Sequence, residues 1–132
     1  MALWYVLYNK KNNEFVGFGG AYGATMHVYT SPYPEGPFTH RSPFPSVPGG
    51  MGDIFMYADD TDSSSNKADA AYLVYNAYHG AVHERFTFVI QLDDDYYGVV
   101  PSTLANTTAV VEGLWMFNRE GTHYLVGSYL SG

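Results

Sequence analysis

The chain has 132 residues and a mass of 14.7 kDa, which fits one domain with a real core but is short for a complete large barrel or propeller. Aromatic residues make up 17% of it and charged residues 14%, a balance that favours sheets over helical bundles. The 13 acidic residues outnumber the 6 basic ones, and the net charge of −7 repels a phosphate backbone, so we expect no nucleic-acid partner. The absence of Cys excludes disulfides and thiolate metal sites.

Short runs of alternating apolar and polar residues, separated by turn residues, predict strands along the whole chain. In chain order these strands lie at residues 3–9, 14–20, 24–31, 36–41, 53–58, 70–76, 82–92, 96–100, 111–118 and 122–129. Polar stretches predict hairpin turns at 10–13, 59–67 and 118–121. Two stretches that contain Pro, at 42–52 and 101–108, predict crossings between units, because Pro cannot continue a ladder. No long helical period is visible.

One phrase recurs, in which an apolar and aromatic strand is followed by a polar turn and a second such strand. It begins with LWYVLYN, GDIFMYADD and EGLWMFNRE at residues 3, 52 and 112. A unit that repeats about every 50 to 60 residues is typical of propeller blades. We therefore predict an all-β partial propeller with two four-stranded antiparallel blades and the first two strands of a third, at about 1–44, 45–102 and 103–132. A β-sandwich is the alternative.

Several segments, in this order, resemble the middle of a glycoside hydrolase family 43 catalytic domain, with the closest likeness to its galactanase branch. They are VLYN (6–9), TSPYPEGPFTH (30–40), GDIFMYADD (52–60), AYLVYNA (71–77), LDDDYYGVV (92–100) and EGLWMFNREGTHYLVGSYLSG (112–132). The resemblance implies a five-bladed propeller that hydrolyses glycosides with inversion in a central funnel. Such a site needs a protonated acid and a basic carboxylate about 6.5 to 9.5 Å apart. The family adds a third acid that raises the pKa of the donor.

By the match of flanking residues, Asp53 resembles the modulating aspartate and Glu112 resembles the general acid. Each directly precedes an innermost strand, which implies the same rim of the funnel. The sequence departs from the family at Gly52, where an Arg is usual, and after Glu112, where Ala-Pro is usual. The family's general base belongs to a blade that would precede residue 1, and its closing blade would follow residue 132. Without the resemblance, the sequence predicts that Asp53 is a turn residue and that Glu112 is an ordinary exposed acid.

Aromatic faces bind sugar rings, and we assign Tyr22 and Tyr78 as candidates for this contact. Trp4 and Trp115 are instead expected in the core between blades. Asn106 begins a glycosylation sequon, which is modified only in a eukaryotic secretory pathway.

We expect no metal site and no cofactor. Asp59, Asp60 and Asp62 lack the glycine and glutamate of a calcium loop, so they predict a solvated hairpin turn. The run 93–95 is three successive Asp, which predicts mutual repulsion in a surface loop. His79 and His83 are four apart on an extended segment, too distant to share a zinc ion.

The chain is therefore expected to be a family 43-like carbohydrate-active module with an incomplete inverting site. If active, it would hydrolyse galactan- or arabinan-type glycans once a partner chain or missing segment completes the site. The alternative is a non-catalytic, self-assembling structural or glycan-binding protein. We expect carbohydrate as the ligand, a homo-oligomer formed through exposed blade edges, no membrane contact and a secreted or extracellular location, with no signal peptide in this chain.

Overall fold

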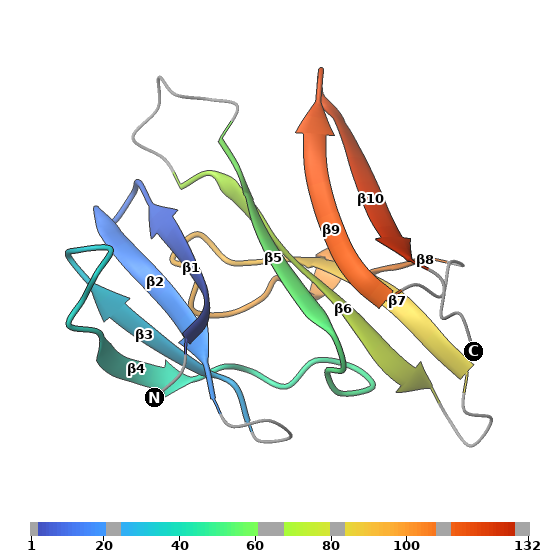
Figure 1. Ribbon diagram of the computed structural model, residues 1–132, viewed down its shortest axis with the longest axis horizontal. Coiled ribbons are helices and arrows are strands. Elements are labelled where there is room, and N and C mark those ends of the chain that lie inside the picture. The colour runs from blue at the N-terminus through green and yellow to red at the C-terminus, as the bar shows by residue number, and fades with distance from the viewer. Residues whose placement is uncertain (1–2, 21–24, 61–67, 80–83, 108–111, 129–132) are drawn as a thin grey trace.

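The computed structural model shows an all-β protein and describes residues 3–20, 25–60, 68–79, 84–107 and 112–128. Its strands form three antiparallel sheets, which we call the first, second and third blades (Figure 1). The first contains β1 (Leu3–Asn9), β2 (Glu14–Gly19), β3 (His27–Ser31) and β4 (Thr39–Pro43). The second contains β5 (Ile54–Asp59), β6 (Ala70–His79), β7 (Glu84–Gln91) and β8 (Ala105–Thr107), and the third contains β9 (Glu112–Arg119) and β10 (Thr122–Ser128). Two four-stranded blades and two strands of a third confirm the predicted partial propeller.

The core lies between the blades, because each strand turns alternate side chains toward a neighbouring sheet. Between the first and second blades, Val16 and Phe18 of β2 belong to the same buried cluster as Leu73 and Tyr75 of β6. A smaller cluster between the second and third blades contains Val74, Leu114 and Met116. Figure 1 shows the blades side by side, with the second between the other two. Among the described residues, no helix is long and apolar enough to cross a membrane.

The segment predicted as a strand at 96–100 is mainly a turn. One carboxylate oxygen of Asp93 accepts hydrogen bonds from the backbone N–H groups of Asp95, at 3.2 Å, and Tyr97, at 3.0 Å. Tyr96 between them has a φ of +64° and a buried ring. The prediction is wrong because this side-chain capture of the backbone competes successfully with the strand ladder.

The fourth strand of the second blade instead lies within the stretch that was predicted as a crossing. There the chain forms a short 3₁₀ turn, η2 (Pro101–Thr103), and then β8, which pairs with β7. The segment before it keeps a single ladder contact, a bridge between Leu92 and Val99. Pro101 is compatible with this arrangement because the first residue of a 3₁₀ turn needs no backbone N–H.

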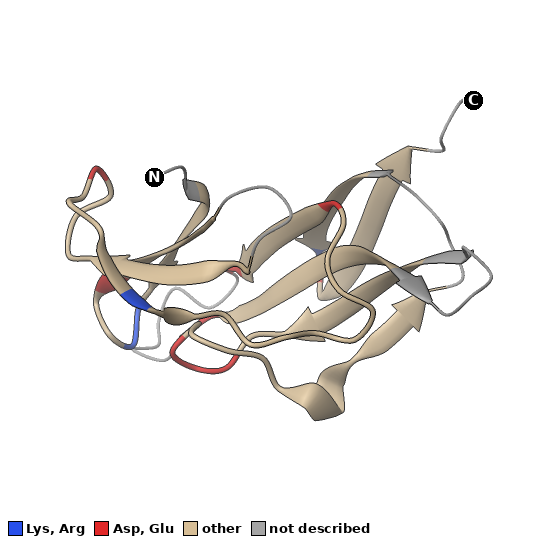
Figure 2. Ribbon diagram, turned by 90° about the horizontal axis from the view of Figure 1, so that it is seen from below, with Lys and Arg blue, Asp and Glu red and all other residues tan. Residues whose placement is uncertain are grey.

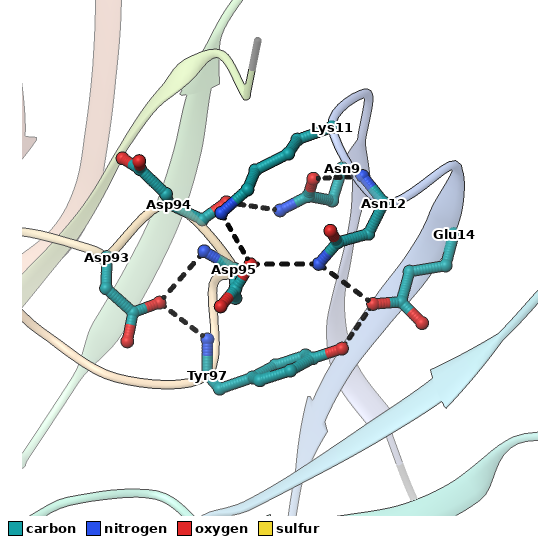
Figure 3. Close-up of polar contacts among 8 residues, drawn as sticks. All are labelled: Asn9, Lys11, Asn12, Glu14, Asp93, Asp94, Asp95 and Tyr97. Atoms are coloured by element: carbon teal, nitrogen blue, oxygen red, sulfur yellow. Dashed lines mark hydrogen bonds and ion pairs between the residues drawn. The ribbon is translucent and has the colours of Figure 1, made fainter.

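The acidic run 93–95 forms a surface turn, as predicted, and Asp94 and Asp95 of this turn also bind the first blade (Figure 3). Lys11 Nζ lies 2.9 Å from a carboxylate oxygen of Asp95, and Asn9 Nδ2 donates to the carbonyl oxygen of Asp94 at 2.9 Å. The hydrogen bond from Lys11 lowers the pKa of Asp95 below its usual range. On the same side, the Tyr97 hydroxyl donates to the Glu14 carboxylate. The turn thus joins the first and second blades.

Asp59 is the buried last residue of β5, not part of a solvated turn. Its carboxylate accepts a hydrogen bond from Asn118 Nδ2 at 2.7 Å and lies 2.9 Å from His123 Nε2. The carboxylate is buried because the third blade supplies these partners. The next residue, Asp60, is exposed and lies 2.5 Å from Lys10 Nζ of the first blade, and Asp62 lies outside the described residues. Both acids therefore connect blades.

The prediction that Trp4 and Trp115 belong to the core is also wrong. Trp4 is 40% exposed on β1, and Trp115 is 58% exposed on β9. Each side chain lies on the outer face of an end blade, whereas the buried clusters lie between blades. Alternation along a strand separates its two faces but does not say which face another sheet covers.

Candidate functional site

The first strands of the three blades form a row that positions the candidate acids. Strand β5 contacts both β1 and β9, and Figure 1 shows the three strands running in the same direction. Asp53 directly precedes β5, and Glu112 is the first residue of β9. The backbone therefore places both acids at the starting ends of neighbouring strands. Their assignment as modulating and donor acids remains a prediction.

The bend at Asp53 is held against β6 by two backbone hydrogen bonds. The N–H of Gly52 donates to the carbonyl oxygen of Asn76 at 2.7 Å, and the N–H of Asn76 donates to the carbonyl oxygen of Asp53 at 2.9 Å. A Cβ atom on Gly52 would lie only 3.2 Å from that Asn76 oxygen. Glycine at this position is thus explained by the close approach of two backbones, and the Asp53 side chain is left exposed.

Tyr5 of β1 contacts the same bend and was missed by the sequence analysis. Its hydroxyl donates to the carbonyl oxygen of Ile54 at 2.6 Å, and its ring meets Phe55 edge to face at a centroid distance of 6.0 Å. Burial raises the pKa of Tyr5, and the negative charge of Asp53 raises it further. The raised pKa agrees with the hydroxyl keeping its proton and donating it to the backbone directly after Asp53.

A sequence signal for Tyr5 does exist. When the three copies of the repeat are superposed on their first strands, Tyr5, Phe55 and Trp115 occupy the same position. An aromatic residue in all three copies at the starting end of the row would have identified this position.

The backbone at Glu112 is shaped by a β-bulge. Glu112 lies opposite Ser128, but the register shifts between Val126 and Ser128, and Gly113 has a φ of +61°. A similar register shift occurs at the start of β1. Bulges redirect a strand and occur often beside active sites. The side chain of Glu112 lies outside the described part of the structure.

The remaining candidate residues are distributed as follows. Tyr22 lies outside the described residues, and so does the side chain of Tyr78, whose backbone pairs with Arg85 between β6 and β7. The roles of both tyrosines in sugar binding remain predictions. Asn106 is exposed on β8, a position that a glycan can reach.

Within the ranges that the structure describes, no group of three or more His, Asp or Glu side chains is arranged to hold a metal ion. His79 and His83 fall outside this statement, because the His79 side chain and all of His83 are not described. The expectation of no metal and no cofactor remains a prediction.

Comparisons with solved structures identify similar folds. The chain resembles a structure of exo-β-1,3-galactanase from Phanerochaete chrysosporium with β-1,3-galactotriose, with 27% identity and a TM-score of 0.71 over 96% of this chain and 29% of that one. It resembles an endo-1,4-β-xylanase from Bacteroides thetaiotaomicron with 23% identity and a TM-score of 0.65 over 95% of this chain and 44% of that one. An α-L-arabinofuranosidase from Clostridium thermocellum gives 22% identity and a TM-score of 0.65 over 96% of this chain and 42% of that one.

These structures confirm the resemblance to glycoside hydrolase family 43 and the propeller-type fold. The chain spans 29% of the galactanase and 42 to 44% of the other two enzymes. No protein-family model and no curated protein matches the sequence.

Proposed function

We propose that this chain is a propeller segment of a glycosidase-type, carbohydrate-active protein, and that glycans bind at the starting ends of β1, β5 and β9. The observation that carries the proposal is the position of Asp53 and Glu112 at the same ends of neighbouring strands, with the Tyr5 hydroxyl bonded to the carbonyl oxygen of Ile54, the residue after Asp53. Galactan is the first substrate to test, since a similar fold is that of a β-1,3-galactanase. A secreted or extracellular location suits this function.

The proposed chemistry is hydrolysis with inversion. Glu112 donates its proton to the leaving glycosidic oxygen, and the negative charge of Asp53 helps Glu112 to retain that proton until the bond breaks. A second carboxylate removes a proton from the attacking water on the opposite face of the sugar. That base must come from a further blade or from a partner chain, so we propose that this segment is active only in a completed propeller.

Release of reducing ends from β-1,3-galactan, and binding of β-1,3-galactotriose followed by backbone NMR shifts, test the proposal. Glu112→Gln should abolish any hydrolysis while sugar binding persists, and Asp53→Asn should weaken both. Asp60→Asn is the matched control, because it removes the same charge from an exposed residue at the other end of β5. Equal responses to Asp53→Asn and Asp60→Asn, or hydrolysis unaffected by Glu112→Gln, would contradict the proposal.

A second candidate function is a non-catalytic structural or glycan-binding protein that assembles with itself. Trp115, Tyr124 and Val126 form an exposed apolar surface on the third blade, and a structural role would account for its exposure. Sugar binding without hydrolysis in a completed assembly would favour this function over the first.

A further inference from the structure

The two ends of the row of blades carry uncovered apolar faces. On the first blade, Trp4, Val6, Tyr8 and Phe15 form what we call the β1 face, where the rings of Tyr8 and Phe15 lie 5.0 Å apart. On the third blade, Trp115, Phe117, Tyr124 and Val126 form the β9–β10 face, where the rings of Phe117 and Tyr124 stack at 5.2 Å. Contiguous exposed apolar patches on soluble proteins mark interaction sites when they are large.

The repeat shows that the β9–β10 face is of the type that another blade covers. Strand registers make Tyr124 and Val126 the equivalents of Val16 and Phe18 in the first blade. Val16 and Phe18 are 0% exposed because the second blade packs on them, whereas Tyr124 and Val126 are 46% and 45% exposed. The third blade therefore presents an interior packing face with no cover among the described residues.

The β1 face is of the complementary type. Trp4 and Val6 are the equivalents of Ile54 and Met56 on β5, which pack against the first blade, and of Leu114 and Met116 on β9, which pack against the second. The second and third blades thus each pack a face of this type against the opposite type on the preceding blade. The exposed β1 face and the exposed β9–β10 face are therefore of opposite types. They are complementary in the same way as the two faces that pack between neighbouring blades within the chain.

We propose that a second copy of this chain places its β1 face on the β9–β10 face and so continues the row of blades head to tail. The proposal deepens the proposed function and rests on it, since it names a source for the blades that would complete the site. The contact repeats the internal interface between blades, in which Tyr5 meets the start of β5. By that equivalence, Trp115 would lie against Trp4 of the second copy.

Charge is compatible with this contact. Figure 2 shows the acidic residues of the described ranges at turns and strand ends, and none of the residues that define the two faces is acidic, although the net charge is −7. Arg119 is exposed at the end of β9, at the position that Asp59 occupies in β5. Asp59 meets Asn118 and His123, whereas Arg119 would meet their equivalents Tyr8 and Phe15 of the second copy. The internal interface thus pairs a carboxylate with polar side chains, whereas the proposed interface would pair a cation with aromatic rings.

Sedimentation velocity over a dilution series from about 1 mM to about 1 µM tests the proposal, since this range covers weak and moderate affinities. We expect mass above 14.7 kDa that rises with concentration. Trp4→Arg and Trp115→Arg should each weaken association about 30-fold or more, as substitutions at the centre of an interface do. Tyr33→Arg is the control, because Tyr33 is as exposed as Trp115 but lies in the turn between β3 and β4.

A mixture of the two tryptophan variants distinguishes this interface from general stickiness. Each variant keeps one intact face, so the mixture should form a one-to-one complex that grows no further, at concentrations where each variant alone is monomeric. Folding of both variants is checked by far-UV circular dichroism. A wild-type monomer at every concentration would overturn the proposal and leave these faces to other blades. The proposal would also be overturned if only Trp115→Arg weakened association, or if Tyr33→Arg weakened association as much as the tryptophan variants do.

The outcome is separable from that of the proposed function. Assembly without sugar binding would support this interface and contradict the glycan site. Sugar binding by a strict monomer would support the glycan site and overturn this interface.

Discussion

Two equivalent positions of the repeat, Phe18 and Val126, should respond very differently to truncation to alanine. Phe18 is fully buried between the first and second blades, where its ring meets Phe44 edge to face at 5.9 Å. Removing a buried Phe side chain costs about 3 to 5 kcal/mol of the free energy of unfolding. Val126 is 45% exposed, so removing its methyl groups should cost less than about 1 kcal/mol.

Urea unfolding followed by far-UV circular dichroism measures both effects, at about 1 µM protein so that any association is weak. With a slope near 2 kcal/mol per molar urea, Phe18→Ala should lower the midpoint by about 1.5 to 2.5 M and Val126→Ala by less than about 0.5 M. If Phe18→Ala does not fold, Phe18→Leu should still lower the midpoint more than Val126→Ala. Equal shifts would refute the assignment of one face as covered and the other as open.

Three further predictions concern contacts between blades and the backbone of the candidate site. Asp59→Asn should cost about 1 to 3 kcal/mol of unfolding free energy, because the Asp59 carboxylate is buried against the third blade. A double-mutant cycle with His123→Gln should show coupling, and strictly additive effects would argue against this contact between blades. Burial raises the pKa of Tyr96 and Tyr97 to about 12 each, above the value near 10 in an unfolded chain. The folded state holds these protons more tightly, so their contribution to stability is full below about pH 10 and is lost as the pH rises toward 12. Absorbance titration should show late-ionising tyrosines in the folded protein, and one fewer of them in Tyr96→Phe. Uniform ionisation of the tyrosines near pH 10 in the folded protein would contradict this prediction. Gly113→Ala should cost about 1 kcal/mol because of its φ of +61°, and an unchanged urea midpoint would contradict the bulge.

Strand positions and the repeat were predictable from the sequence because alternation and turn residues act locally. The segment 96–100 was not, because Asp93 captures backbone N–H groups and alternation does not report that competition. The burial of Asp59 depends on His123, which is 64 positions away. No local pattern contains that information.

The candidate site was predictable only in part, for a similar reason. Asp53 and Glu112 were identified through flanking residues, and the row of strands that aligns them follows from blade packing. Tyr5 was missed because its hydroxyl reaches across to another blade, at Ile54. The exposure of Trp4 and Trp115 depends on which sheet faces are covered, and this is a property of the assembly and not of the strand.

The most direct test of the proposed glycan site is a crystal structure of the chain with β-1,3-galactotriose. The sugar is predicted at the starting ends of β1, β5 and β9, with a hydroxyl within hydrogen-bond distance of Asp53 and a glycosidic oxygen beside Glu112. A sugar bound only on the aromatic surface of Trp115 and Tyr124, or no sugar at saturating concentration, would contradict this site.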